Sequence, residues 1–284
     1  MSRIGVIGAG LMGSGIAEVT ARAGVDVVVC ERDRAASVRG RERIEHSIQR
    51  AVARGKLAED EAQRAIDSIR HTADIGACAD RQLVVEAVLE DQAAKVAIFG
   101  ELDRVVESPD AVLATNTSSI PIMKLAMVTG RPQQVVGIHF FNPVPVLRLV
   151  ELVTSLHTSA ETVAVAESFA RDTLGKRVVK SPDRAGFVVN ALLIPYLLSA
   201  VRMLESGFAT PQDIDDGMVE GCAHPMGPLA LLDLIGLDTA TAVADSLFEE
   251  FKEPLYAPPP LLNRMVEAGL LGRKTGRGFF TYDD

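Results

Sequence analysis

The fold is decided by residues 4–31, IGVIGAGLMGSGIAEVTARAGVDVVVCE. Two short apolar runs, Ile4–Ile7 and Val27–Cys30, enclose a glycine-rich turn and a helical stretch that ends at about Arg22. A strand, a G-x-G-x-x-G turn, a helix and a second strand that closes on an acid, Glu31, are the context that a dinucleotide-binding unit requires. A G-x-G-x-x-G turn outside that context would be a weak signal.

The glycine turn is predicted to bind a pyrophosphate. Gly8 permits the tight turn, Gly10 lets the backbone approach the phosphates, and Gly13 lets the helix pack on the sheet. The free N–H groups and the dipole of the following helix favour negative charge there. The turn comprises Gly8, Ala9, Gly10, Leu11, Met12 and Gly13.

The acid after the second strand indicates which nucleotide the turn serves. Glu31 lies 23 positions after Gly8 (31 − 8), where a carboxylate can bind both ribose hydroxyls and repel a 2′-phosphate. NAD is therefore favoured over NADP. Arg32 and Arg34 follow directly, so NADP stays an alternative.

The rest of the chain falls into two parts. Further strand candidates are Leu83–Glu86, Val112–Thr115, Val135–Ile138 and Leu149–Val153. After about Pro182 they give way to Leu- and Ala-rich helical segments at Phe187–Ser206, Pro211–Glu220, Thr239–Phe251 and Leu261–Ala268. We expect an α/β Rossmann-type N-terminal domain with a mostly parallel sheet, residues 1–183, and an all-α C-terminal domain, residues 184–284. A helical insertion at about 35–70 splits at Gly55.

Composition excludes several classes of protein. The formal net charge is −9, from 29 Lys and Arg against 38 Asp and Glu, which argues against a nucleic-acid partner. Three scattered cysteines exclude a disulfide framework and a zinc knuckle, and no metal site is expected. The longest apolar stretch, Val188–Leu204, is interrupted by polar residues, so no membrane association is expected. Without a visible secretory signal, a cytoplasmic location is expected.

Polar residues follow two of the predicted strands, where ligands bind in open α/β sheets. Asn116-Thr117-Ser118-Ser119 follows Val112–Thr115, and His139 follows Val135–Ile138. An imidazole beside a hydroxyl suits the oxidation of an alcohol, because a base must take the hydroxyl proton. Glu151, an acid within an apolar run, is predicted to pair with His139 and fix its tautomer. A hydrogen-bonded core histidine is the alternative.

A stripe of arginines lies in the helical insertion. Positions 43, 47, 50 and 54 share one helix face, and three of them are Arg. Such a stripe suits phosphate groups, since Arg binds phosphate bidentately. The residues alone favour the simpler explanation, a solvated helix face.

Six motifs together resemble the L-3-hydroxyacyl-CoA dehydrogenase family, most closely its single-function short-chain members. They are GAGLMGSGIA at 8–17, ATNTSSIPI at 114–122, GIHFFNPVPV at 137–146, GFVVNALLIP at 186–195, HPMGPL at 224–229 and LGRKTGRGFF at 271–280. The resemblance covers nearly the whole chain. It implies NAD-dependent interconversion of (S)-3-hydroxyacyl-CoA, with 3-hydroxybutyryl-CoA favoured, and 3-oxoacyl-CoA. It also implies a homodimer.

The resemblance implies roles for individual residues. His139 matches the catalytic base and Glu151 its acidic partner, while Ser118 and Asn190 match donors to the C3 oxygen of the substrate. Ser118 also matches a substrate contact, together with Arg50 and Arg54, which match contacts to the CoA phosphates. The positions that match cofactor contacts are Gly8 to Gly13, Glu31, Glu90, Lys95, Asn116, Asn142 and Lys274.

Some features depart from the family or leave alternatives. Ala185 and Ala191, on either side of Asn190, stand where the family has Pro and Arg. His224 is expected to be structural. Two other functions remain open: a dehydrogenase of the same fold that acts on a hydroxy acid or sugar acid without CoA, and a nucleotide-binding protein without turnover.

Overall fold

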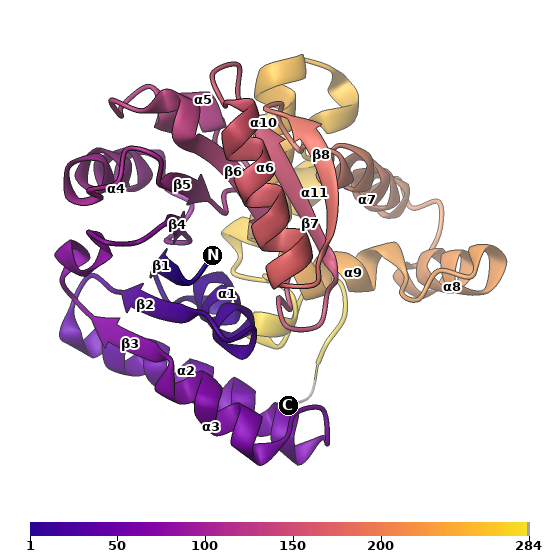
Figure 1. Ribbon diagram of the computed structural model, residues 1–284. Coiled ribbons are helices and arrows are strands. Elements are labelled where there is room, and N and C mark those ends of the chain that lie inside the picture. The colour runs from indigo at the N-terminus through magenta and orange to yellow at the C-terminus, as the bar shows by residue number, and fades with distance from the viewer. Residues whose placement is uncertain (283–284) are drawn as a thin grey trace. The chain divides into compact units, whose positions relative to one another are not determined.

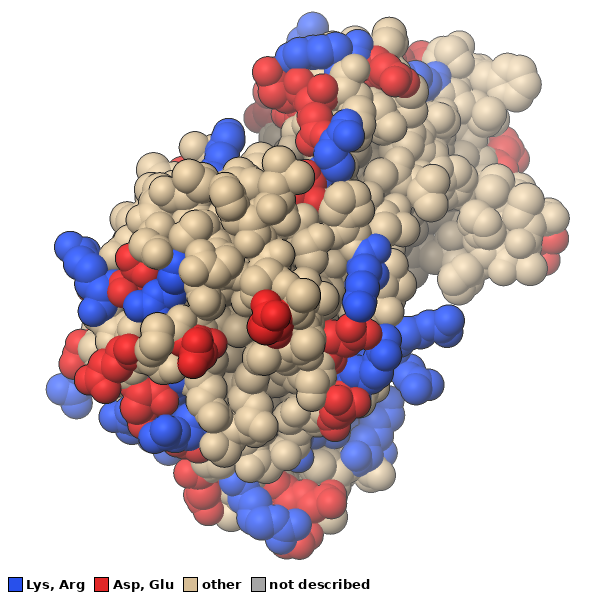
Figure 2. All heavy atoms as spheres, turned by 45° about the horizontal axis from the view of Figure 1, so that its top comes forward, with Lys and Arg blue, Asp and Glu red and all other residues tan. Residues whose placement is uncertain are grey.

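The computed structural model describes residues 1–282. Contacts divide the chain into two compact units, Met1–Arg184 and a second that begins at Ala185. Among the described residues, no helix combines the length and the apolar composition needed to cross a membrane. On the face drawn in Figure 2, acidic and basic side chains are interspersed over much of the surface.

The first unit is built on one eight-stranded sheet. The strands are β1 Arg3–Ile7, β2 Asp26–Cys30, β3 Ile69–Thr72, β4 Leu83–Glu86, β5 Val112–Thr115, β6 Val135–Phe140, β7 Leu149–Thr154 and β8 Arg177–Pro182. Their order is β3-β2-β1-β4-β5-β6-β7-β8. The first six strands in this order are parallel, whereas β7 pairs antiparallel with β6 and parallel with β8. The predicted mostly parallel sheet is confirmed.

Helices and short turns cover both faces of this sheet. They are α1 Leu11–Arg22, α2 Arg34–Ala53, α3 Glu59–Asp67, η1 Ile75–Cys78, α4 Gln92–Val105, α5 Ile122–Ala126, η2 Pro132–Gln134, α6 Ala160–Ser168 and η3 Phe169–Thr173. One face packs against α1, α2, α3 and α6 in a single apolar core. Strand residues alternate in direction, so Gly5 and Gly137 face the other side, where they meet Cys78 of η1 and Ile122 of α5.

The helical insertion consists of α2 and α3. Figure 1 shows the two helices side by side next to β3. Asp33 caps α2 by accepting a hydrogen bond from the backbone N–H of Ala36, and Gly55 has a φ of +64° in the turn that follows. That positive φ suits glycine, which explains why the chain reverses there.

Two strands are absent from the sequence-based prediction, and both lie at the edges of the sheet. β3 has the sequence IRHT and β8 has RVVKSP, and neither forms an apolar run. Edge strands face solvent on one side, so they do not need the apolar composition of central strands. They form because each pairs in parallel with an apolar neighbour, β2 or β7.

The second unit is helical. Its elements are α7 Val189–Glu205, α8 Pro211–Cys222, α9 Pro228–Ile235, α10 Leu237–Phe251, η4 Pro254–Tyr256, α11 Pro260–Glu267 and η5 Arg273–Thr275. They share an apolar core of their own. The sequence prediction lacks α9. The N-terminus of α9 is capped by a residue of α8, because the carboxylate of Asp215 accepts hydrogen bonds from the N–H groups of Leu229 and Ala230.

Candidate active site

The glycine turn joins β1 to α1. Gly8 has a φ of +90°, and its N–H donates to the carbonyl of Cys30 at 2.8 Å. A Cβ at Gly13 would stand 1.9 Å from the carbonyl oxygen of Gly8, whereas a Cβ at Gly10 would meet no atom within 4 Å. Gly8 and Gly13 are therefore needed for the turn itself. Gly10 borders open space at the N-terminus of α1, which fits a pyrophosphate.

Two charged side chains hold Ala9 in this turn. The Ala9 N–H donates to Oε1 of Glu31, and the Ala9 carbonyl accepts a hydrogen bond from the guanidinium of Arg43. The neighbouring Leu11 is 63% exposed, and Met12 packs partly against the core. The acid at the end of β2 is thus close to the turn, as a ribose ligand requires.

A three-residue hydrogen-bonded chain lies at the ends of β5, β6 and β7. Nδ1 of His139 is 2.8 Å from Oε2 of Glu151, and Nε2 of His139 is 2.9 Å from Oγ of Ser118. The register of the antiparallel pair places His139 directly opposite Glu151. Both side chains are buried, and the ring of Phe141 packs edge-on against the imidazole with centroids 4.7 Å apart.

The contacts of the imidazole favour one tautomer when Glu151 is ionised and the ring is neutral. An ionised carboxylate only accepts hydrogen bonds, so Nδ1 of His139 carries the proton that Glu151 binds. Nε2 of the neutral ring then has a lone pair, and the Ser118 hydroxyl donates to it. A nitrogen with such a lone pair can accept a proton from a hydroxyl group.

Four more of the predicted residues lie in the loops after β4, β5 and β6 and in the first turn of α4. Oδ1 of Asn116, after β5, accepts the N–H of Phe140 at 2.9 Å and so ties β5 to β6. Asn142 is exposed in the segment after β6. Oε2 of Glu90, in the loop after β4, lies 3.3 Å from Nζ of Lys95, in α4.

Glu90 and Lys95 belong to a partly buried polar network that the sequence did not reveal. Lys95 is 1% exposed, and its Nζ is 2.7 Å from Oε1 of Glu86. Burial would raise the pKa of the Glu90 carboxyl, but the ammonium of Lys95 and the donors of residues 117–119 outweigh it and lower that pKa. The signal that could have revealed the network is Glu86, an acid within a buried strand, which is costly unless it is paired.

The arginines of the predicted stripe on α2 have different surroundings. Arg43 contacts the glycine turn, whereas Arg50 is exposed in the last turn of α2 and Arg54 is exposed at its C-cap. The contact of Arg43 with a backbone carbonyl 34 positions away could not be inferred from helical spacing.

The remaining predicted residues belong to the second unit. Asn190 is the second residue of α7. Nζ of Lys274, in η5, forms an ion pair at 2.6 Å with the carboxylate of Asp238. His224 follows α8, and its Nδ1 is 3.2 Å from the hydroxyl of Tyr196, a contact that suits a structural role.

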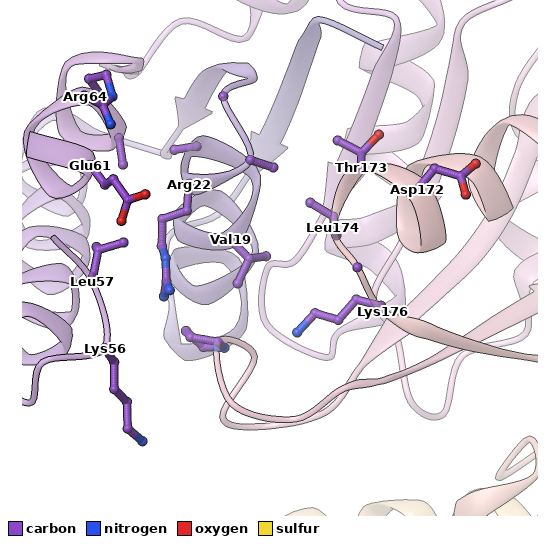
Figure 3. Close-up of a pocket in the computed structure, with 16 residues that line it drawn as sticks. Val19, Arg22, Lys56, Leu57, Glu61, Arg64, Asp172, Thr173, Leu174 and Lys176 are labelled. Atoms are coloured by element: carbon purple, nitrogen blue, oxygen red, sulfur yellow. The ribbon is translucent and has the colours of Figure 1, made fainter.

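A cavity of about 680 Å³ opens at the other end of α1 from the glycine turn (Figure 3). Arg22, Lys56, Arg64 and Lys176 line it. Arg22 and Arg64 already pair with carboxylates one helical turn away, and Nζ of Lys176 donates to the carbonyls of Val144 and Leu147. Most of the basic side chains around this cavity therefore already contact groups of the protein itself.

Comparison with known proteins gives a consistent result. The family model "3-hydroxyacyl-CoA dehydrogenase, NAD binding domain" matches residues 3–184, and "3-hydroxyacyl-CoA dehydrogenase, C-terminal domain" matches residues 186–282. The chain is 62% identical over 282 residues to a 3-hydroxybutyryl-CoA dehydrogenase of Mycobacterium tuberculosis, with 99% of each chain covered.

Two solved structures are similar over the full length. The crystal structure of M. tuberculosis FadB2 has a TM-score of 0.99 at 62% identity, and the alignment covers 100% of this chain and 99% of that one. The (S)-3-hydroxybutyryl-CoA dehydrogenase PaaH1 of Ralstonia eutropha has a TM-score of 0.95 at 42% identity, with both chains fully covered.

Proposed function

The chain belongs to the 3-hydroxyacyl-CoA dehydrogenase family and is an oxidoreductase, and we propose that it interconverts (S)-3-hydroxybutyryl-CoA and acetoacetyl-CoA with NAD as cofactor. The observation that carries this proposal is the hydrogen-bonded chain Ser118–His139–Glu151 beside a dinucleotide-type glycine turn. The names of the similar proteins supply the class of substrate.

In this proposal His139 is the general base. Its Nε2 takes the proton of the C3 hydroxyl during oxidation and returns it during reduction. Glu151 holds the ring in the tautomer in which Nε2 accepts a proton, and stabilises the imidazolium that forms. Ser118 and Asn190 are proposed to donate hydrogen bonds to the C3 oxygen as charge develops on it. In this proposal the C3 hydroxyl takes the place of the Ser118 hydroxyl at Nε2, and the Ser118 hydroxyl turns to the C3 oxygen.

The residues around the glycine turn fit NAD. The open space at Gly10 and the N-terminus of α1 accommodate a pyrophosphate, and the second oxygen of the Glu31 carboxylate is suited to the ribose hydroxyls. When bound, NAD would supply the hydride acceptor for oxidation at C3. Glu90, Lys95, Asn116, Asn142 and Lys274 complete the proposed cofactor contacts.

The proposal also covers the CoA moiety and the assembly. Arg50 and Arg54 are exposed, and we assign them to the CoA phosphates. Exposed apolar side chains of the helical unit, among them Leu192 and Phe208, support self-association as a homodimer. The buried thiols of Cys30 and Cys78 are free, which fits a reducing compartment such as the cytoplasm.

The test is the reduction of acetoacetyl-CoA by NADH, followed by the loss of NADH absorbance. We expect turnover by the natural chain and a loss of about 10²- to 10⁴-fold in kcat for His139→Gln, the usual range for removing a general base. The matched control is His157→Gln, since His157 is exposed on a turn. Wild-type turnover in His139→Gln would refute the assignment of the base. NADH binding without turnover by the natural chain would favour a nucleotide-binding protein.

A further inference from the structure

Glu90 connects the segment after β4 to the turn that carries Ser118. Its Oε1 accepts hydrogen bonds from the N–H of Ser118 at 2.8 Å, the N–H of Ser119 at 2.9 Å and the hydroxyl of Ser119 at 2.9 Å. The hydroxyl of Thr117 donates to the same oxygen. Four donors from three consecutive residues therefore converge on one carboxylate. One of them is the backbone N–H of Ser118, whose side chain reaches His139.

The other carboxylate oxygen of Glu90 contacts a buried ammonium group. Oε2 lies 3.3 Å from Nζ of Lys95, and the same ammonium is 2.7 Å from Oε1 of Glu86. Oε2 of Glu86 accepts the hydroxyl of Thr115 at 2.7 Å. Because Lys95 is 1% exposed and Glu86 is fully buried, this part of the network is fixed by the fold.

The hydroxyl of Thr117 stabilises the turn by hydrogen bonds to its neighbours. Its Oγ1 donates to Glu90 and accepts the N–H of Ile120 at 2.9 Å and that of Ser119 at 3.3 Å. Thr117 is 1% exposed. Because its hydroxyl is buried and already bonded to Glu90, Ser119 and Ile120, we expect Thr117 to affect a reaction through the turn.

We propose that Thr117 and Glu90, supported by Lys95, are positioning residues that hold Ser118 where its hydroxyl meets Nε2 of His139. Lys95 acts through Glu90, because two carboxylates already surround its ammonium. The part that concerns catalysis rests on the proposed function, whereas the hydrogen-bonded turn does not. Donors to a developing charge act only when they are already in place, so a loosened turn lowers kcat.

The experiment compares Thr117→Val with Thr117→Ser. Valine keeps the branched shape and removes the hydroxyl, whereas serine keeps the hydroxyl. The matched control is Thr129→Val, since Thr129 is another buried threonine, whose hydroxyl donates to the carbonyl of Ala126. Three quantities are measured: kcat with acetoacetyl-CoA and NADH, the Kd for NADH by fluorescence titration, and amide hydrogen exchange over residues 117–120.

For Thr117→Val we expect kcat to fall about tenfold, which corresponds to about 1.4 kcal/mol. Exchange over residues 117–120 should accelerate by a similar factor, with the Kd for NADH within about twofold of the natural value. Thr117→Ser should restore both quantities, and Thr129→Val should change neither. An unchanged kcat with unchanged exchange would overturn the proposal. So would a rise in the Kd for NADH that accounts for the whole loss of activity, because that pattern indicates cofactor contact.

A second variant covers the case in which Thr117→Val does not fold. Glu90→Gln preserves the shape of a side chain that is about one-third exposed and removes its charge. We expect faster exchange over residues 117–120 in this variant, and unchanged exchange would overturn the proposal. If the natural chain fails to reduce acetoacetyl-CoA, the proposed function fails, whereas the exchange data still decide whether Thr117 and Glu90 hold the turn.

Discussion

The carboxylate of Glu151 lies 2.8 Å from Nδ1 of His139, and the two residues face each other across the antiparallel pair of β6 and β7. A sheet parallel throughout would not place these residues opposite each other in this register. The reversal of β7 at the end of β6 therefore brings the imidazole and the carboxylate together from positions 12 apart in the sequence. It does so on strands, which hold side chains more rigidly than loops do.

Replacing the carboxylate by an amide tests this relationship. In Glu151→Gln the amide can donate to Nδ1, which would move the ring proton to Nε2 and remove the acceptor. We expect kcat to fall about 10²-fold or more, with the Kd for NADH within about twofold. Steady-state kinetics and a fluorescence titration measure the two quantities. Glu161→Gln, at an exposed position in the first turn of α6, is the control. Activity retained in Glu151→Gln would contradict a role for the carboxylate in fixing the tautomer.

The sequence was sufficient to predict the central strands, the glycine turn and the pairing of His139 with Glu151. Buried strands require apolar runs, and an acid inside such a run requires a partner, so both features can be recognised from the local sequence. The edge strands β3 and β8 cannot be recognised in this way, because they are partly exposed to solvent and need no apolar run. The contacts of Arg43 with Ala9 and of Glu90 with residues 117–119 join distant segments, which periodicity cannot reveal.

The carboxylate of Glu31 is expected to set the choice of nucleotide. In Glu31→Ser the charge that would repel a 2′-phosphate is gone, while the exposed side chain of Arg32 remains beside it. We expect the ratio of kcat/KM for NADPH to that for NADH to rise about tenfold or more. Glu42→Ser, an exposed position on α2, removes the same charge elsewhere. An unchanged ratio in Glu31→Ser would mean that Glu31 serves only to hold Ala9.

Charge reversal at the end of α2 tests whether Arg54 contacts the phosphates of CoA. In Arg54→Glu we expect the KM for acetoacetyl-CoA to rise about tenfold, because an ionic contact to phosphate becomes a repulsion. The KM for acetoacetyl-pantetheine, which lacks the nucleotide phosphates, should stay the same. Arg41→Glu makes the same change of charge outside the stripe, since Arg41 pairs with Glu45. Equal effects on both thioesters would argue against a phosphate contact at Arg54.

The lowered pKa of Glu90 predicts how the stability of the protein depends on pH. Folding favours the ionised carboxylate, so Glu90 contributes stability above the pKa it has in the unfolded chain. That contribution is lost as the pH falls through the lower pKa of the folded state. The difference in Tm between the natural chain and Glu90→Gln should therefore be largest near neutral pH and shrink as the pH falls below the ordinary pKa of a glutamate, about 4.3. Thermal unfolding at a series of pH values measures it, and a difference that grows in acid would contradict the prediction.

Two glycines of one turn should respond to the same substitution in opposite ways. Gly10→Ala adds a methyl group where no atom lies within 4 Å, and the φ of −64° at Gly10 suits alanine. We expect a loss of stability below about 1 kcal/mol, the scale of an N-cap change, but a Kd for NADH raised about tenfold or more, because the methyl group occupies space meant for the pyrophosphate.

Gly13→Ala should instead destabilise the fold. The added Cβ would stand 1.9 Å from the carbonyl oxygen of Gly8, so α1 or the turn has to move. The expected cost is about 1–3 kcal/mol or more, seen as a lower Tm. Gly100→Ala, inside α4 and with no atom within 4 Å, is the control for the substitution itself. Unaltered NADH binding in Gly10→Ala would place the pyrophosphate elsewhere, since a ligand that leaves room for a methyl group there does not lie against the turn.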